Sequence, residues 1–181
     1  MSHEYYDEKN KKILELETRR KIYELVKRYS GDHFRALERK SNLSVGVLKY
    51  HINFLTKHNF IRQEKDGNNT RYFIANIQHE NRKLLGLLRQ KNIRKIILCI
   101  FSNENCHHED IVKYVNISPS TVSWYLKRLE REEIISYVKD GRKTTYSLRI
   151  DKEEIVKLLV TYKESFLDAL VNKTVEMWEI R

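Results

Sequence analysis

Apolar residues recur every three or four positions in several segments, and this spacing predicts amphipathic helices. On the segment 119–132, for example, Val122, Leu126 and Leu129 fall on one side of the helix. Short β-rich segments flank Asp-Gly turns, which are typical of hairpins because glycine accepts a positive φ. The pattern predicts helices over 18–30, 34–41 and 45–58, strands over 60–64 and 70–74, helices over 92–102, 108–115 and 119–132, and strands over 134–138 and 144–148. The expected fold class is therefore mainly α with small β-hairpins (α+β).

The second half of this order repeats the first, 74 residues later. Aligned without a gap, residues 18–74 and 92–148 share 13 identities in 57 positions, whereas chance at ordinary composition gives roughly three or four. Identical pairs include Ser44 with Ser118, and the Lys-Asp-Gly turns of the two expected hairpins also coincide. We infer two copies of one small domain.

Each copy has the order helix, helix, turn, helix, hairpin, which is that of a winged helix-turn-helix. Ser44 and Ser118 stand where an N-cap belongs, because their hydroxyls can accept hydrogen bonds from the free N–H groups of the third helix. Pro119 suits the first helical position, where its missing N–H costs nothing. The expected parts are an N-terminal extension (1–17), a first winged-helix domain (18–76), a connecting helix (77–91), a second winged-helix domain (92–150) and a C-terminal helix (151–181).

The outward faces of the two third helices are the candidate DNA-reading surfaces. Small residues at the start of such a helix let it approach base edges in a major groove, and basic residues further along suit phosphates. The alternatives are a solvated basic stripe, or packing of the aromatic residues Trp124 and Tyr50 against another domain or subunit. The candidates are Ser118, Ser120, Thr121, Ser123, Trp124, Lys127 and Arg128 in the second copy, and Ser44, Gly46, Val47, Lys49, Tyr50 and Asn53 in the first.

The hairpin tips KDGNNTR (65–71) and KDGRKTT (139–145) are the expected wings. Basic wing residues can reach backbone phosphates or a minor groove, although a hairpin tip can also be merely polar, a reading that is strongest for the Asn pair of the first tip. The wing candidates are Lys65, Asn68, Asn69, Arg71, Lys139, Arg142 and Lys143. Because the second tip carries Arg and Lys where the first carries two Asn, the second copy is the better DNA-binding candidate.

The distribution of charge favours a polyanionic partner. The net charge is +10, but residues 18–148 alone carry 26 basic and 13 acidic side chains, while both ends are slightly acidic. A basic middle with acidic ends is expected of a nucleic-acid-binding core with interaction segments at its ends. A Lys-rich solvated surface would produce the same totals.

The segment SPSTVSWYLKRLEREEIISYVKDGRKTTYSL resembles the recognition helix and wing of prokaryotic regulators of the ArsR/MarR type. Two such units in one chain resemble the tandem winged-helix regulators that are common in archaea, and the resemblance covers about 18–148. In the first copy, Val45 and Gly46 stand at the positions of Pro119 and Ser120. The resemblance implies DNA-binding transcriptional control, often repression, by a homodimer.

Apolar residues recur at spacings of three and four over 152–180, and this pattern predicts one long helix with an apolar stripe. We expect the stripe to form a homodimer interface, and the alternative is that the helix folds back over its own domains. The stripe consists of Ile155, Leu159, Tyr162, Phe166 and Leu170.

The segment ENCHHED (104–110) contains competent metal ligands. Adjacent residues rarely converge on one ion, however, and the Cys-x-Cys helix motif of ArsR-type metal sensors is absent, so we expect a loop with a helix start and no metal or other cofactor. Cys99 lies in an apolar run and is expected in the core. With two cysteines and a polar N-terminus, the chain fits a reducing cytoplasm and association with the nucleoid.

The sequence contains neither a Gly-rich phosphate loop nor a nucleophile motif, so we expect no enzyme. The expected function is sequence-specific binding of double-stranded DNA, with repression of transcription, and no membrane association. One alternative is an interaction scaffold that contacts the transcription machinery. Another is an architectural DNA binder without sequence preference.

Overall fold

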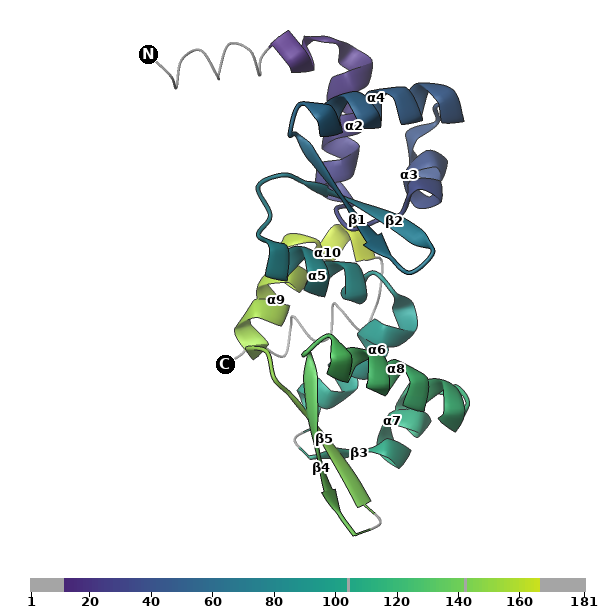
Figure 1. Cartoon of the computed structure of the whole chain (residues 1–181), viewed down its shortest axis with the longest axis vertical. Helices are drawn as coiled ribbons and strands as arrows, with labels where there is room; N and C mark the ends of the chain where they lie inside the picture. The colour runs from purple at the N-terminus through teal and green to yellow at the C-terminus, as the bar shows by residue number, and fades with distance from the viewer. Residues whose placement is uncertain (1–11, 104, 142, 167–181) are drawn as a thin grey trace. The chain divides into compact units, whose positions relative to one another are not determined.

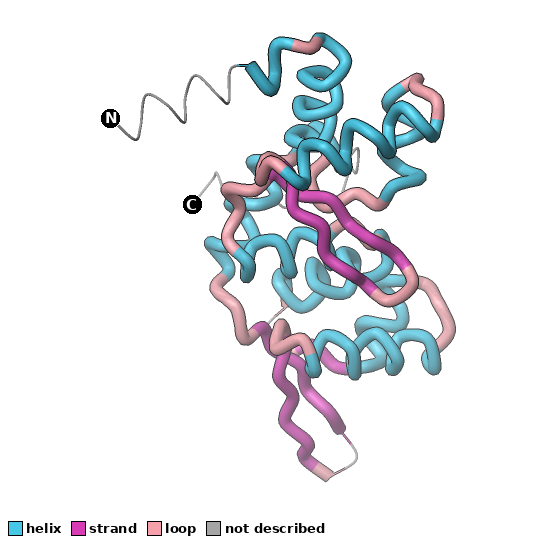
Figure 2. The backbone as a smooth tube through the Cα atoms, turned by 45° about the horizontal axis from the view of Figure 1, so that its top comes forward, coloured by secondary structure: helices cyan, strands magenta, loops and turns pink. Residues whose placement is uncertain are grey.

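The computed structural model describes residues 12–166 except 104 and 142. The chain divides into two compact units, Met1–Arg82 and Lys83–Arg181, and each is treated by itself. Helices dominate both, and the strands form small antiparallel hairpins that follow the third helix of each unit (Figures 1 and 2). The prediction of a mainly α fold with small hairpins is therefore confirmed.

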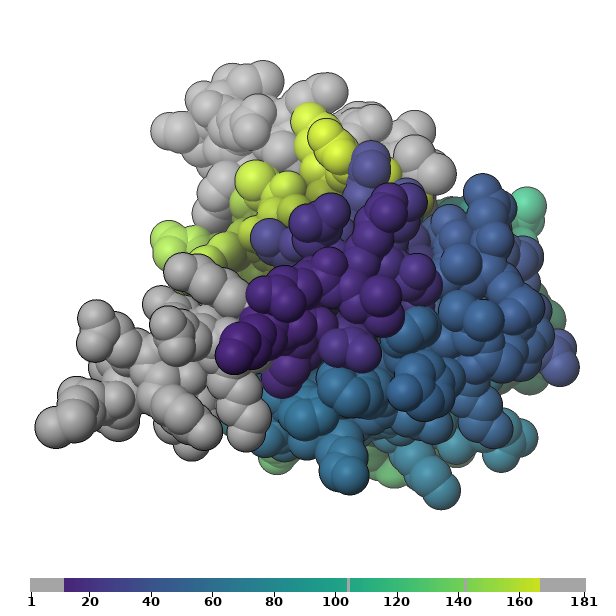
Figure 3. Space-filling view, turned by 90° about the horizontal axis from the view of Figure 1, so that it is seen from above, coloured from purple at the N-terminus to yellow at the C-terminus, as the bar shows by residue number. Residues whose placement is uncertain are grey.

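The first unit follows the predicted order. Its elements are α2 (Glu17–Arg28), α3 (Phe34–Ser41), α4 (Val45–Lys57), β1 (Ile61–Asp66) and β2 (Asn69–Ile74), and α5 (His79–Leu88) begins at its end. The three helices pack on one another, and the space-filling view shows the purple α2 beside the blue α3 and α4 (Figure 3).

The core of the first unit is formed by the apolar side of each helix. Leu48, Ile52 and Leu55 of α4 are fully buried together with Ile22 and Val26 of α2. Burial of one such side chain contributes about 1.5–3 kcal/mol, so the side of α4 that faces inward is strongly determined. The opposite side of α4 is left to solvent.

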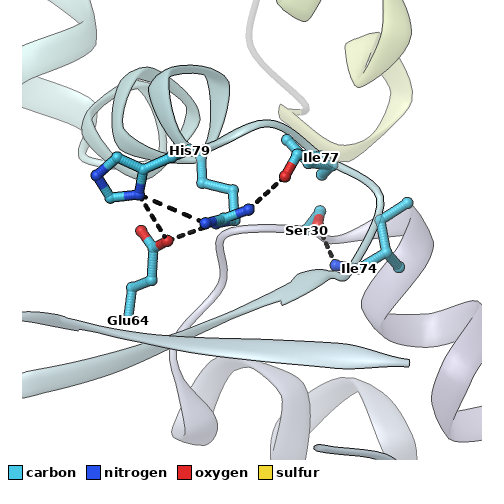
Figure 4. Close-up of polar contacts among 6 residues, drawn as sticks. Ser30, Glu64, Ile74, Ile77 and His79 are labelled. Atoms are coloured by element: carbon cyan, nitrogen blue, oxygen red, sulfur yellow. Dashed lines mark hydrogen bonds and ion pairs between the residues drawn. The ribbon is translucent and has the colours of Figure 1, made fainter. Parts of the chain in front are cut away.

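Ion pairs join the hairpin of the first unit to the start of α5. The Arg82 guanidinium donates hydrogen bonds to the Glu64 carboxylate and to the carbonyl of Ile77, and His79 lies 3.3 Å from the same carboxylate (Figure 4). On β2, the N–H of Ile74 donates to the hydroxyl of Ser30 at 3.2 Å (Figure 4). These contacts hold the base of the hairpin against the rest of the unit.

The second unit repeats the order and extends it. Its elements are α6 (Lys91–Ser102), β3 (Cys106–His107), α7 (His108–Val115), α8 (Pro119–Arg131), β4 (Ile135–Asp140), β5 (Lys143–Leu148), α9 (Lys152–Thr161) and α10 (Lys163–Phe166). The strand order is β3-β5-β4, and the β4–β5 hairpin projects from the helices (Figure 2). Because α6 is buried on nearly all sides, it forms the centre of this unit.

Backbone conformation repeats at the same interval as the sequence. Each described residue with a positive φ has a counterpart 74 positions away that shares this conformation: Gly31 with Asn105, Asn42 with Asn116, Asn59 with Glu133, and Gly67 with Gly141. These positions include the C-caps of the second helices. A non-glycine residue rarely adopts this conformation, so four coincident pairs are strong structural support for the repeat.

A third strand in the second unit was not predicted. β3 pairs with β5 through Cys106 opposite Tyr146 and His107 opposite Thr145, where a loop was expected. In the first unit, a single bridge between His33 and Arg71 occupies the matching place. A strand of one or two residues has no hydrophobic period, so pattern analysis cannot detect it.

The expectation of one long C-terminal helix is wrong within the described residues. α9 ends at Thr161, the chain turns at Tyr162, and α10 covers Lys163–Phe166. The turn directs the ring of Phe166 toward the guanidinium of Arg89, which lies 4.6 Å from the ring centre. Cation–π contact of this kind, together with burial of the ring, favours the turn over a straight helix.

The expected dimer stripe is buried within the single chain. Ile155 and Leu159 have no exposed surface, and Tyr162 and Phe166 are less than a tenth exposed. The Arg89 guanidinium also donates to the hydroxyl of Ser165 at 2.8 Å. The stripe therefore stabilises its own chain, in agreement with the alternative that this segment folds back. Leu170 lies outside the described residues.

Candidate nucleic-acid interface

A serine cap and a proline define the start of α8. The hydroxyl of Ser118 accepts a hydrogen bond from the N–H of Thr121 at 3.3 Å, and Pro119 occupies the first turn, as predicted. Ser120, Lys127 and Trp124 are exposed, and Trp124 exposes 56% of its surface. With half-buried Thr121, these three residues form one outward surface, which we name the α8 face.

Two of the residues expected to contact DNA are committed to other contacts. The Ser123 hydroxyl donates to the carbonyl of Pro119 at 3.0 Å and lies 2.9 Å from Nε2 of His108. Arg128 donates to Oε1 of Gln90 at 3.0 Å. Both side chains therefore help to position α8, one against α7 and the other against the residue before α6, in addition to the DNA contact that the sequence predicts for them.

His108 and Gln90 were missed by sequence analysis. His108 lies in the ENCHHED segment, where its neighbours suggested metal chemistry rather than a contact with α8. Gln90 carries no sequence signal, because its partner Arg128 lies 38 residues away. Only the packing of α8 against the preceding helices brings these pairs together.

The outward side of α4 has a different chemical character. Val47 and Tyr50 are 41% and 62% exposed, and Gly46 and Asn53 are exposed beside them. These four residues form the α4 face. The helix starts as predicted, with the hydroxyl of Ser44 accepting from the N–H of Val47 at 3.4 Å, and Lys49 is exposed on its flank. Val45, which was not among the candidates, is also exposed (51%).

The two hairpins also differ. In the second unit, Lys139 and Lys143 are exposed on the projecting β4–β5 hairpin, while Arg142 lies outside the described residues. In the first unit, Lys65, Asn68 and Asn69 are exposed at the tip of the β1–β2 hairpin.

Arg71, expected to contact phosphate, is only 6% exposed. Its Nε donates to Oδ2 of Asp66 at 2.5 Å, and Nη1 donates to the carbonyl of Gly31 at 2.8 Å. The guanidinium joins the hairpin to the loop before α3. Arg71 is therefore a structural residue, and its burial argues against the expected phosphate contact.

A groove of about 280 Å³ separates α8 from the β4–β5 hairpin. Lys127 from the helix and Lys139 from the hairpin line it, together with Glu130 and Tyr146. Burial raises the pKa of Tyr146, so its hydroxyl remains protonated and able to donate a hydrogen bond near neutral pH. The two lysines give the groove a positive border that suits a phosphate backbone.

The potential metal ligands of the ENCHHED segment serve the fold. The Sγ atom of Cys106 lies 3.6 Å from that of Cys99, and both thiols are buried. His107 lies 3.4 Å from the carbonyl of Thr144 through Nδ1, and its N–H donates to Oδ2 of Asp110. Among the residues that the structure describes, no group of three His, Cys, Asp or Glu side chains is arranged to hold a metal.

Comparison with known protein families assigns both halves of the chain. Residues 16–85 match a family model described as an N-terminal HTH (helix-turn-helix) domain. Residues 89–136 match a model described as winged helix-turn-helix DNA-binding. The chain carries two tandem helix-turn-helix domains. Each contains one of the two outward faces, and the model that matches the second is described as DNA-binding.

A relative supports the same assignment. An uncharacterised HTH-type transcriptional regulator of the archaeon Methanocaldococcus jannaschii is 32% identical over 148 residues, which is 81% of this chain. The chain spans 36% of the length of that relative. Within residues 12–166, apart from positions 104 and 142, no helix is long and apolar enough to cross a membrane.

Proposed function

We propose that the protein regulates transcription by binding double-stranded DNA, with the α8 face in a major groove and the β4–β5 hairpin on the backbone. The observation that carries this proposal is the combination of exposed Trp124, Ser120 and Lys127 beside a hairpin with exposed Lys139 and Lys143. A purely solvated helix gains nothing from an exposed indole. Stacked bases or a thymine methyl group would give the indole of Trp124 an apolar partner.

The two parts of this surface have different roles. Lys127, Lys139 and Lys143 would pair with phosphates and supply affinity for any sequence. Ser120, Thr121 and Trp124 would meet base edges, where each good contact discriminates by about 1–3 kcal/mol. Affinity should therefore fall steeply with salt, while sequence preference depends on the three residues at the start of α8.

Fluorescence anisotropy with labelled duplexes at several salt concentrations tests the proposal. Lys127→Ala and Lys143→Ala should each weaken binding to all duplexes and reduce the slope of log affinity against log salt by about one. Lys157→Ala is the matched control, because Lys157 is an exposed lysine on another helix, α9. If no duplex binds at low salt, DNA regulation fails as the function.

We propose repression as the direction of control, because a protein that occupies a promoter excludes polymerase by its volume alone. The resemblance to ArsR-type regulators supports this direction. Run-off transcription from a template with a selected binding site should decrease as protein is added. An increase in transcript would overturn this part of the proposal.

We also propose that the protein binds as a homodimer, as the same resemblance implies. Its interface would have to lie outside the stripe Ile155–Phe166, since the described stripe residues are buried within the chain. Sedimentation equilibrium gives the mass directly. A monomeric mass at all concentrations, with and without DNA, contradicts the dimer.

A scaffold function is the second candidate, because the β4–β5 hairpin exposes apolar surface. Val138 is 68% exposed and Tyr137 is 48% exposed, and both would suit a protein of the transcription machinery. The anisotropy experiment separates the candidates, since a scaffold needs no affinity for DNA. Equal affinity for all sequences would instead identify an architectural binder.

A further inference from the structure

The α4 face and the α8 face carry different chemistry at matching positions. The repeat places Gly46 opposite Ser120, Val47 opposite Thr121, Tyr50 opposite Trp124, and Asn53 opposite Lys127. Val and Thr have nearly the same shape, so at that position the copies differ chiefly by a hydroxyl. At the last position they differ by a charge. The two faces therefore cannot prefer the same partner groups.

The α4 face is open to close approach. A Cβ atom placed on Gly46 would have no neighbouring atom within 4 Å. Val47 and Tyr50 are three residues apart on the helix and both are largely exposed, so their apolar surfaces adjoin. Asn53 follows by another three residues and is exposed on the same side. A flat polar surface can thus approach the backbone at Gly46 and meet an apolar pair and then an amide.

The surroundings of the α4 face indicate what covers it. Lys49 and Lys57 are exposed on α4 itself, and Arg35 and Arg39 are exposed on α3, which packs against α4. A nucleic acid supplies phosphates for such cations, whereas an apolar partner protein does not. An apolar face on a pair of helices that exposes four cations is therefore best matched by a DNA major groove.

Among base edges, the α4 face matches A·T pairs. Thymine presents a methyl group in the major groove, which apolar side chains contact, and adenine presents the N6 and N7 pair that an Asn amide recognises. Lys127 occupies the position of Asn53 in the second domain, so the copies differ at this point.

We propose that α4 reads A·T base pairs in the major groove, with Val47 and Tyr50 against thymine methyl groups and Asn53 on an adjacent adenine. This inference rests on the proposed DNA binding and specifies what the first domain recognises. It assigns Gly46 a role in close approach rather than in the fold.

Replacing thymine by uracil tests the inference, because the change removes only the methyl group. A high-affinity duplex is first selected from a random library with the full chain, and each thymine is then replaced singly. Loss of one buried methyl should weaken binding about fourfold. At the thymine that contacts Val47, the loss of affinity on replacement by uracil should be smaller in the Val47→Thr variant, because a hydroxyl replaces one of the two methyl groups of the side chain. If no uracil replacement changes the affinity of a duplex that binds, the inference fails while the proposed function stands.

Replacing Asn53 by lysine, the residue at the matching position of α8, tests the role of Asn53. Asn53→Lys should shift the preference at one position from A·T to G·C, with a discrimination of roughly 5- to 150-fold. Asn76→Lys is the matched control, because Asn76 is exposed in the loop after β2 and gains the same charge. It should raise affinity for all duplexes without a new preference. Equal effects of the two variants would overturn the inference and leave α4 as a surface for a protein partner.

The variants can be compared because the side chains involved are exposed. Circular dichroism should give the same unfolding midpoint for Val47→Thr and Asn53→Lys as for the unchanged chain. Absence of binding to every selected duplex would contradict the proposed function itself. Absence of thymine sensitivity alone contradicts only the reading of A·T pairs.

Discussion

Replacing Arg71 by alanine distinguishes a structural arginine from a phosphate ligand. The guanidinium donates to Oδ2 of Asp66 at 2.5 Å and to the carbonyl of Gly31 at 2.8 Å. The side chain of Arg71 is 7% exposed and that of Asp66 is 19% exposed. The substitution removes both hydrogen bonds and leaves the carboxylate near the surface of the hairpin.

The expected loss of stability follows from the burial of both partners. Removing one member of a buried ion pair costs about 3–5 kcal/mol. Because Asp66 keeps some contact with water, we expect the lower end, about 3 kcal/mol of unfolding free energy for the first domain. Replacing an exposed cation changes the unfolding free energy by no more than about 0.5 kcal/mol. The stability losses expected for a structural arginine and for an exposed phosphate ligand therefore differ severalfold.

Native-state hydrogen exchange measures this loss in the first domain. Both tryptophans, Trp124 and Trp178, lie outside that domain, so tryptophan fluorescence is a poor probe of it. The N–H of Tyr72 donates to the carbonyl of Asp32 at 3.0 Å, and the N–H of Gly31 donates to the carbonyl of Tyr72 at 2.7 Å. Both amides join the hairpin to the loop that Arg71 holds, so their protection should fall in Arg71→Ala.

Lys65→Ala provides the control, since Lys65 is an exposed cation on the same hairpin. It should leave the protection of both amides unchanged. If Arg71→Ala instead leaves stability within about 0.5 kcal/mol and reduces the salt slope of DNA binding by about one, then Arg71 contacts phosphate and the reasoning from its burial is wrong.

Three further predictions follow from buried groups. Burial, with Arg71 nearby, lowers the pKa of His33 below its usual 6.5, and its Nδ1 accepts from the N–H of Ala36 at 3.3 Å. The unfolded chain therefore binds the proton more tightly, so stability should be full above pH 6.5 and decline as the pH falls below it. Urea midpoints should decline less in His33→Asn, which keeps a capping side chain, and an equal decline would exclude His33 as the cause. Burial raises the pKa of Cys99 to about 12 and also raises that of Cys106, so iodoacetamide at pH 8 should alkylate both slowly in the native protein and rapidly in urea. Mass spectrometry measures this, and rapid native alkylation would contradict their burial. Ile155→Ala should lower unfolding free energy by about 2–5 kcal/mol at every protein concentration; a halved mass with unchanged stability would restore the stripe as a dimer interface.

The helices of both domains could be predicted from sequence because their determinants are local. The seam Leu48, Ile52 and Leu55 is buried as the spacing of three and four residues requires, and Ser44 and Ser118 cap the third helices. These features depend on neighbours within one or two turns. The outward position of Trp124 and Tyr50 follows from the same periodicity.

The roles of Arg71, Arg128 and the C-terminal stripe could not be predicted, because their partners are distant in the chain. Gly31 lies 40 residues before Arg71, and Gln90 lies 38 before Arg128. An amphipathic stripe requires an apolar cover but does not specify whether the same chain or a second one provides it. For Arg71, basic character alone suggested DNA, and only the folded loop reveals the acceptors that bind it.

The matched ends of α4 and α8 make the two helices exchangeable parts. Each is 13 residues long, begins after a capping serine, and is followed two residues after its end by a residue with positive φ, Asn59 or Glu133. Their buried seams also coincide in register. Residues 45–57 could therefore be transplanted onto 119–131, and the reverse, with the contacts of the buried seam kept, while the links of Ser123 to His108 and of Arg128 to Gln90 would be lost. Each chimera would have the same third helix in both of its domains. Under the proposed function, the DNA sequence that it prefers would report the specificity of that helix alone.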